Sequence, residues 1–223
     1  MNKDEALELQ TKMKEAGFYE GKLDGIWGPK SEAAYTAFTA TLEGNSNLDI
    51  AWSAKVSQEF VERIKLMCIN LKMEEDGPNC MMSCMAWESG ETFSPAIKNG
   101  AGSGATGLIQ FMPKTAKSLG TTVEALAAMS AVEQLEYVEK YFKPHKGKLK
   151  TLSDIYMAIL WPKAIGKAED YVMFDKAETP ITYRQNSGVD INADGKCTKA
   201  EAAAKVMQKY KKGMLPKNRR VIA

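Results

Sequence analysis

The sequence has 223 residues, of which 44% are hydrophobic and 26% are charged, the proportions of an ordinary soluble globular protein. This length allows one domain of the usual size and a second, smaller one. The net charge of +2 gives no general attraction to nucleic acid, and no segment approaches the roughly 20 apolar residues needed to span a bilayer. We therefore expect no nucleic-acid partner and no stable membrane insertion.

The first ten residues, MNKDEALELQ, form an amphipathic helical pattern and contain no apolar signal-peptide core. We therefore expect synthesis in the cytoplasm. The four cysteines are Cys68, Cys80, Cys84 and Cys197, and their spacing completes no metal site. We interpret them as reduced, buried, apolar residues. Lysines gather around the single histidine at 143–150, and we interpret this stretch as solvated surface, with weak attraction to an anionic polymer as the alternative.

Residues 1–41 are predicted to form a helix, a turn and a second helix. Leu9, Met13 and Ala16 share one helical face, and Gly17 can end that helix. The dipeptides Asp-Gly and Gly-Pro at 24–25 and 28–29 are turn signals, and the proline suits the first turn of the next helix.

The run LQTKMKEAGFYEGKLDGIWGPKSEAAYTAF, residues 9–38, resembles the small three-helix peptidoglycan-binding module of cell-wall hydrolases. The sequence departs from that family at Thr39, where a glutamine is usual. The resemblance implies a wall-binding domain at residues 1–45. It assigns contacts with the wall to Asp24, Gly25, Trp27, Gly28 and Tyr35.

A polar stretch, EGNSNLD at 43–49, predicts a boundary, and we place a linker at 46–54 and a second domain at 55–223. Beyond the boundary, Val56, Phe60, Ile64 and Met67 recur at helical spacing. The segment EEDGPN interrupts this pattern, and Asn79 can cap a further helix. Strand-like alternation is almost absent, so the predicted fold class is mainly α.

Glu88 lies at the end of that further helix, on the same face as Met81, Cys84 and Met85. Apolar surroundings and the negative end of a helix both raise the pKa of a carboxyl group, as a general acid at neutral pH requires. The alternative is a solvated glutamate at a frayed helix end.

The glycine-rich segment NGAGSGATGLIQFMPKTA, residues 99–116, becomes apolar around a single amide, Gln110. Glycines let a backbone approach a polysaccharide closely, and a buried amide needs hydrogen-bond partners. A sugar N-acetyl group and the local backbone are both candidate partners for Gln110.

Glu88-Ser89, followed about 20 residues later by GLIQF, resembles the first two motifs of the lytic transglycosylase (goose-lysozyme-like) superfamily. The wider sequence is similar to phage endolysins that join this helical, lysozyme-like domain to a wall-binding module. Such enzymes cleave the β-1,4 bond between N-acetylmuramic acid and N-acetylglucosamine in bacterial peptidoglycan. The resemblance implies that Glu88 is the catalytic acid/base, that Ser89 orients it, and that Gly107, Gln110 and Phe111 line sugar subsites. It also implies release through a membrane pore and action in the periplasm or wall.

The third motif of that superfamily, Ala-Tyr-Asn, is missing, because Ala158 is followed by Ile159 and Leu160. Tyr156, Trp161 and Tyr171 are the candidates for an aromatic sugar contact, with packing in the core as the alternative for each.

Most glycosidases use two carboxylates, whereas a lytic transglycosylase uses one and forms a 1,6-anhydro product from the sugar's own C6 hydroxyl. Glu91 is the nearest second carboxylate in sequence, with Asp154, Asp170 and Asp175 as unsupported candidates. We favour the single-glutamate reaction, without a catalytic cofactor and in a monomer. The alternative is a muramidase that uses water.

The stretch DINADGKCTKAE, residues 190–201, fits the twelve-residue EF-hand loop. The ligands would be Asp190, Asn192, Asp194, the carbonyl of Lys196, Thr198 and Glu201. The incoming segment shows no convincing helical pattern, so we predict an isolated loop that holds a structural Ca²⁺ ion. The alternative is a metal-free turn.

Two interpretations from other classes stay open. One is a non-catalytic wall-binding or virion structural protein, which the altered third motif allows. The other is a calcium sensor, although a single unpaired loop is unusual for a sensor.

Overall fold

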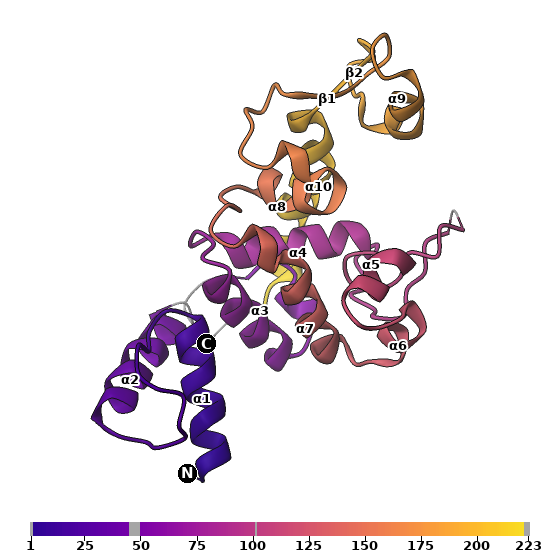
Figure 1. Ribbon diagram of the computed structural model, residues 1–223. Coiled ribbons are helices and arrows are strands. Elements are labelled where there is room, and N and C mark those ends of the chain that lie inside the picture. Colours follow the sequence, from indigo (N-terminus) through magenta and orange to yellow (C-terminus); the bar gives the residue numbers. More distant parts are fainter. Residues whose placement is uncertain (1, 45–49, 101, 221–223) are drawn as a thin grey trace.

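The computed structural model describes residues 2–44, 50–100 and 102–220, with side chains omitted for 39–44 (Figure 1). The chain is mainly helical, which confirms the predicted fold class. No described helix is both long and apolar enough to cross a bilayer.

The N-terminal part is a pair of helices, α1 (Lys3–Glu15) and α2 (Pro29–Gly44). Their contact is a small separate core of Met13, Tyr19, Ala34 and Phe38. Residues 2–44 contain no third helix, which differs from the three-helix expectation. In the connection between the two helices, the buried amide of Gln10 accepts hydrogen bonds from the N–H groups of residues 24 and 25 and donates one to the carbonyl of Ile26. These bonds hold the connection in a turn.

The larger part is built around α4 (Gly77–Glu88), which is buried from its first residue to Ala86. A helix that is apolar on all sides belongs inside a core. Around α4 pack α3 (Gln58–Asn70), α8 (Leu152–Leu160) and α10 (Lys199–Gly213). The helices α5 (Pro113–Ser118), α6 (Val123–Ala128) and α7 (Ala131–Phe142) complete the body. Short 3-10 turns occur at Ser53–Lys55, Lys143–His145, Pro162–Ala164, Ser187–Val189 and Pro216–Asn218.

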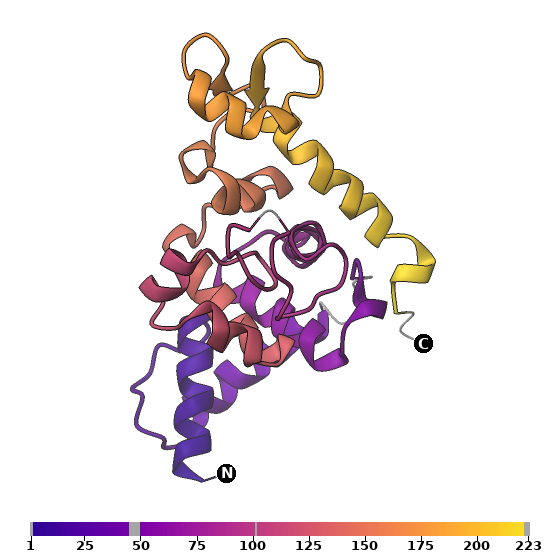
Figure 2. The ribbon, with the colours of Figure 1, turned by 90° about the vertical axis from the view of Figure 1, so that its right-hand side faces the viewer.

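A small lobe stands at the far end of the molecule from the N-terminal helices (Figure 1). It contains β1 (Val172–Asp175), which pairs antiparallel with β2 (Lys196–Thr198), and the helix α9 (Pro180–Asn186). The sequence pattern did not predict α9, whose seven residues are too few for an apolar periodicity to show. From β2 the chain enters α10, which runs from the lobe back along the side of the body (Figure 2).

The predicted linker, 46–54, differs from the structure where it is described. Residues 46–49 lie outside the described residues, and Ile50, Ala51 and Trp52 are buried in the main core. The Trp52 indole donates to the carbonyl of Lys209 over 3.1 Å, and the Trp52 N–H donates to Gly213 over 3.2 Å. Nearby, the Arg220 N–H donates to the Ser53 hydroxyl over 2.8 Å. The second domain therefore begins by residue 50.

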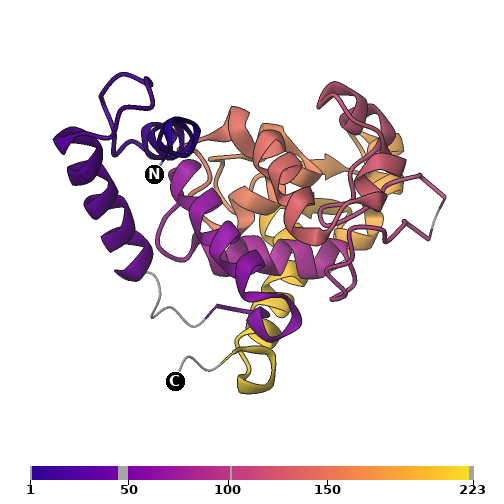
Figure 3. The same ribbon diagram turned by 90° about the horizontal axis from the view of Figure 1, so that it is seen from below.

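The N-terminal helix pair contacts the body at the end of α1 (Figure 3). Lys146 donates to the carbonyl of Glu15 over 2.8 Å, and Lys143 lies 3.8 Å from the Glu15 carboxylate. Leu66 of α3 packs against the small N-terminal core. Two of the lysines interpreted as solvated surface thus lie at this contact. The negative end of the α1 dipole also stabilises their positive charges there.

Candidate active site

Glu88 is the last residue of α4, as the sequence pattern predicted. The side chains of Met81, Cys84 and Met85, which precede it on the helix, are fully buried. Burial raises the pKa of the Glu88 carboxyl group from 4.5 to about 7. A carboxylic acid with this pKa is partly protonated at neutral pH and can both give and take a proton.

The turn after Glu88 is held in an uncommon backbone conformation. Gly90, Glu91 and Phe93 all have positive φ angles, of 60°, 68° and 51°. The buried hydroxyl of Ser89 accepts a hydrogen bond from the N–H of Phe93 over 3.0 Å. Ser89 therefore shapes the turn behind Glu88, and no described hydrogen bond joins it to the Glu88 carboxylate. Strained turns of this kind are common at functional sites.

Of the four candidate second carboxylates, Asp170 is exposed and the other three are engaged elsewhere. Glu91 forms ion pairs with Lys209 and Lys212 of α10, and they lower the pKa of its carboxyl group against the opposing effect of burial. Asp154 is paired with Lys199. Asp175 accepts hydrogen bonds from the N–H groups of residues 177 and 178. Burial is the cause of the raised pKa of Glu88, and no neighbouring carboxylate contributes to it. The site thus presents one carboxyl group.

Two tyrosines lie within electrostatic range of Glu88. Burial and the charge of Glu88 both raise the pKa of the Tyr141 and Tyr156 hydroxyl groups. Tyr156 accepts a hydrogen bond from the indole N–H of Trp87 over 3.1 Å, and Tyr141 donates to the carbonyl of Ala158 over 2.8 Å. Tyr156 was a candidate from the sequence, whereas Tyr141 was not, because its place on the amphipathic helix α7 gave no separate signal.

The other two predicted aromatic residues lie in or near the small lobe. Trp161 packs edge-on against Phe174, with ring centroids 5.0 Å apart, and Lys163 lies over its ring. Tyr171 has Lys167 over its ring at 5.9 Å. Both rings are half-buried, and no described contact joins either of them to Glu88.

The glycine-rich segment is anchored by Gln134 of α7, a residue that the sequence analysis missed. Its fully buried amide accepts from the N–H of Leu108 and donates to the carbonyls of Pro95 and Leu126, over 2.8 to 3.0 Å. Gly107 has a φ of 88°, and a Cβ atom there would lie 2.3 Å from the Gln134 side-chain oxygen. Gly107 thus permits close packing of this loop on α7.

Gln110 bonds to local backbone, one of the two alternatives that the sequence left open. Its amide nitrogen donates to the carbonyls of Gly107, over 3.1 Å, and Ile97, over 3.3 Å. Its φ of 53° is left-handed. Phe111 is buried, with its ring centroid 6.1 Å from that of Tyr141. The second motif therefore forms a compact loop that packs next to the tyrosines at Glu88.

Of the predicted wall contacts, Asp24 and Gly25 belong to the turn held by Gln10. Asp24 also accepts from the N–H of Ile26 over 2.9 Å. Trp27 and Tyr35 form an edge-on aromatic pair, with ring centroids 5.6 Å apart, on the partly exposed side of the helix pair. Gly28 lies directly before α2.

In the loop at 190–201, most of the predicted ligand oxygens accept hydrogen bonds within the loop. The Asn192 side-chain oxygen accepts from Asp194, an Asp194 oxygen accepts from Lys196, and Glu201 accepts from Ile191 and Thr198. One oxygen of Asp190 accepts from Tyr183 and Gly195, whereas its other oxygen is buried without a partner. Among the described residues, no three His, Cys, Asp or Glu side chains are grouped so that they could hold a metal ion.

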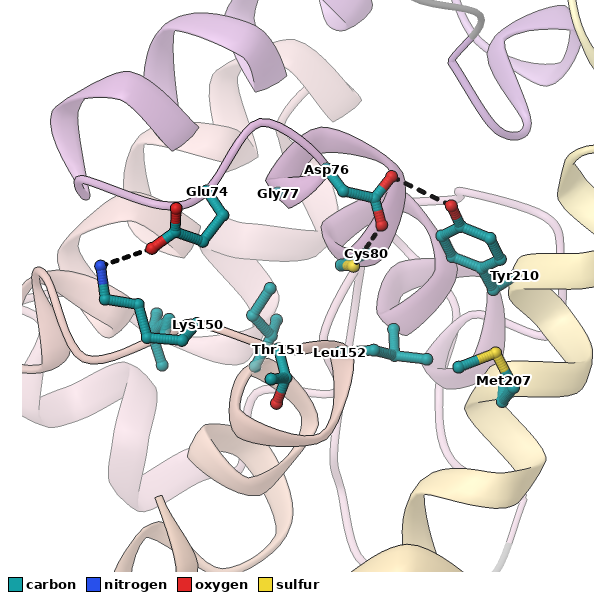
Figure 4. Close-up of a pocket in the computed structure, with 11 residues that line it drawn as sticks. Glu74, Asp76, Gly77, Cys80, Lys150, Thr151, Leu152, Met207 and Tyr210 are labelled. Atoms are coloured by element: carbon teal, nitrogen blue, oxygen red, sulfur yellow. Dashed lines mark hydrogen bonds and ion pairs between the residues drawn. The ribbon is translucent and has the colours of Figure 1, made fainter. Parts of the chain in front are cut away.

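A separate cavity of about 330 Å³ lies at the opposite end of α4 from Glu88 (Figure 4). Each of its charged groups has a bonding partner within the cavity lining. Lys150 contacts Glu74 over 2.6 Å, and Asp76 accepts hydrogen bonds from Tyr210 and from the thiol of Cys80. Because the carboxylates of this cavity are committed to these contacts, the cavity offers no free acid, unlike the site at Glu88.

The four cysteines are free and buried, as predicted.

The comparison with protein families agrees with this site. Residues 66–147, less than half of the chain, match the family model of the transglycosylase SLT domain. This segment contains Glu88, Gln110 and Gln134, and the match supports a lytic transglycosylase catalytic domain in this part of the chain. The protein is a muralytic enzyme of the glycosidase type, and peptidoglycan is its substrate. No curated protein matches the sequence significantly.

Proposed function

We propose that the protein is an endolysin that cleaves the β-1,4 bond between N-acetylmuramic acid and N-acetylglucosamine, with Glu88 as the only acid/base. The observation that carries this proposal is the burial of the Glu88 carboxyl group at the end of α4, which raises its pKa to about 7, while Asp154 and Glu91 are held in ion pairs. A single carboxyl group with this pKa fits a reaction in which one residue first donates a proton and then accepts one.

In this reaction, protonated Glu88 gives its proton to the glycosidic oxygen while the bond from that oxygen to C1 of the muramic acid breaks. The Glu88 carboxylate then removes the proton of the C6 hydroxyl of the same sugar, and that oxygen bonds to C1. The product carries a 1,6-anhydro ring, and Glu88 is again protonated. The C6 hydroxyl is tethered to the reacting sugar, so its effective concentration exceeds that of an external nucleophile.

The mass of the released muropeptides tests this chemistry. We expect digestion of purified peptidoglycan to give anhydro-muramyl ends, which are lighter by one water than the ends produced by hydrolysis. A digestion in ¹⁸O-labelled water should leave these ends unlabelled. Reducing ends that carry ¹⁸O would identify a muramidase instead, and the absence of any soluble fragment would favour the non-catalytic alternative.

We also propose that the N-terminal helix pair binds the cell wall through its exposed aromatic side. The aromatic pair of Trp27 and Tyr35 supports this proposal, because aromatic rings provide flat apolar surface for stacking. In the endolysin role, the enzyme would be made in the cytoplasm of a phage-infected bacterium and would reach the wall through a separate membrane pore.

A third proposal is that the loop at 190–201 binds Ca²⁺ as a structural ion. The unpartnered, buried oxygen of Asp190 supports it, because an oxygen ligand without a hydrogen bond is available to a hard cation. We expect calcium at 100 times its dissociation constant to raise the melting temperature by about 5–10 °C, and chelation to reverse this rise. Asp190→Asn should abolish the shift. A melting temperature that does not respond to calcium would contradict the site.

A further inference from the structure

Lys199, the first residue of α10, has a buried ammonium group. Its side chain is 2% exposed, and its nitrogen lies 2.7 Å from the carboxylate of Asp154, which is 5% exposed. Lys199 also donates to the carbonyl of Lys167 over 2.8 Å, and Asp154 accepts from the N–H of Gly166 over 2.8 Å. Both charges are therefore well bonded, as a buried ion pair must be to offset the loss of hydration.

The partner of Lys199 belongs to the helix that reaches Glu88. Asp154 lies in the first turn of α8, two residues before Tyr156. The Tyr156 hydroxyl accepts the indole N–H of Trp87, which is the neighbour of Glu88. A continuous set of contacts thus runs from the start of α10, through α8, to the end of α4.

Further along, α10 contacts the same region twice more. The Lys205 ammonium lies over the Trp87 ring, 5.8 Å from its centroid, and donates to the carbonyl of Gly188 over 2.7 Å. Lys209 and Lys212 pair with Glu91 in the turn after Glu88. The lysines of α10 therefore hold both Trp87 and the catalytic turn.

We propose that Lys199 is a positioning residue, and that its pair with Asp154 sets α8 so that the Tyr156 hydroxyl is held on Trp87 beside Glu88. Both partners lie outside the matched segment, residues 66–147. Hydrogen-bonded charges fix one geometry of α8 against α10, whereas apolar contacts tolerate several. This inference rests on the proposed role of Glu88.

The chemistry of Tyr156 explains why its position matters. A phenol oxygen that accepts the Trp87 N–H still has its own proton to donate. Burial and the Glu88 charge keep Tyr156 protonated by raising the pKa of its hydroxyl group. The Tyr156 hydroxyl can therefore donate a hydrogen bond to an oxygen atom near Glu88 that gains negative charge during the reaction. It can do so only while α8 holds Tyr156 in place.

The decisive variant is the double substitution Lys199→Met/Asp154→Leu. It removes both charges together, so neither is left buried without a partner, and the fold is expected to survive. We expect a melting temperature within 5 °C of the wild type, an at least tenfold lower kcat and a KM within twofold of the wild-type value. The control is Lys150→Met/Glu74→Leu, which removes an exposed ion pair beside α8 and should leave both kcat and KM at their wild-type values.

A spectroscopic measurement reports the geometry without relying on activity. The chain has four tryptophans, so its indole N–H groups give four resolvable NMR signals, and Trp87→Phe identifies the one from Trp87. We expect this signal to shift in the Lys199/Asp154 double variant and in Lys199→Gln/Asp154→Asn, which also removes both charges, but not in the control.

Wild-type kcat together with an unchanged Trp87 signal in the double variant would overturn the inference. If this double variant does not fold, the same two readouts from Lys199→Gln/Asp154→Asn decide. A shifted Trp87 signal alongside an active Glu88→Gln would instead reject the proposed catalytic role of Glu88 and keep the structural coupling.

Discussion

Glu88→Gln is expected to abolish lysis of bacterial walls while it leaves the protein folded and bound to them. Glutamine has nearly the same shape but cannot transfer a proton, and the loss of a general acid/base costs about 10²–10⁴-fold in turnover. The measurement is the release of soluble muropeptides from purified peptidoglycan. Sedimentation with intact walls should be unchanged, because the N-terminal helix pair has its own core.

The same variant should change how stability depends on pH. The wild-type carboxyl group has a pKa of about 7 when folded and 4.5 as its ordinary value, so the folded protein binds more protons between these limits. Wild-type stability therefore falls as pH rises from 4.5 to 7. The glutamine variant lacks this loss, so it should match the wild type at pH 4 and exceed it by about 1–3 kcal/mol at pH 8. Urea unfolding at the two pH values measures the difference.

Turnover of the wild type should fall as pH rises through about 7, because the donating form of Glu88 is lost there. Glu74→Gln is the control. It removes an exposed carboxylate that pairs with Lys150 at the other end of α4, so it should retain turnover with the same pH profile and lose only some stability. Full activity in Glu88→Gln would refute the assignment, as would a wild-type profile without an inflection near pH 7.

Gln134→Leu should destabilise the protein by about 3–5 kcal/mol, the largest loss expected from a single polar side chain. The leucine leaves the Leu108 N–H and the Pro95 and Leu126 carbonyls without the partner they now have. Each buried group that loses its hydrogen bond costs about 1–3 kcal/mol. Chemical unfolding should show this loss, together with a fall in melting temperature of about 10 °C.

Gln58→Leu provides the comparison, because Gln58 is exposed at the start of α3 and its side chain bonds to two partners at the surface, Glu62 and Arg220. It should change stability by no more than about 0.5 kcal/mol. If Gln134→Leu were as mild as Gln58→Leu, the anchoring role of Gln134 would be wrong. Proteolysis within residues 97–110 should also become faster in Gln134→Leu, since this loop loses its attachment to α7.

The features that depend on local sequence were predictable. The apolar stripe on α4 follows from helical periodicity, and the end of the helix follows from the Ser89-Gly90 pair, so both the position of Glu88 and its apolar neighbours were correctly expected. The turn signals between α1 and α2 likewise gave the correct order of elements. In each case the determining residues lie within a few positions of the feature.

The features that depend on contacts between distant residues were not predictable. Gln134 bonds to Leu108, 26 residues earlier, and only the fold brings the two together. Lys199 and Asp154 are 45 residues apart, and nothing in either local pattern marks a buried ion pair. Trp52 was assigned to a linker because it closely follows the polar run at 43–49, whereas it packs against α10 more than 150 residues later.

The packing of Trp52 and Ser53 against Gly213 and Arg220 has a consequence for engineering. Residues near the start and near the end of the larger domain, as described, are joined by hydrogen bonds, so these two segments lie side by side. A short peptide could join residue 220 to residue 50, and new ends could be opened in an exposed turn such as that at 176–179. A circular permutant of this kind would keep Glu88 in its surroundings and would carry any attached module at the small lobe instead of beside α3.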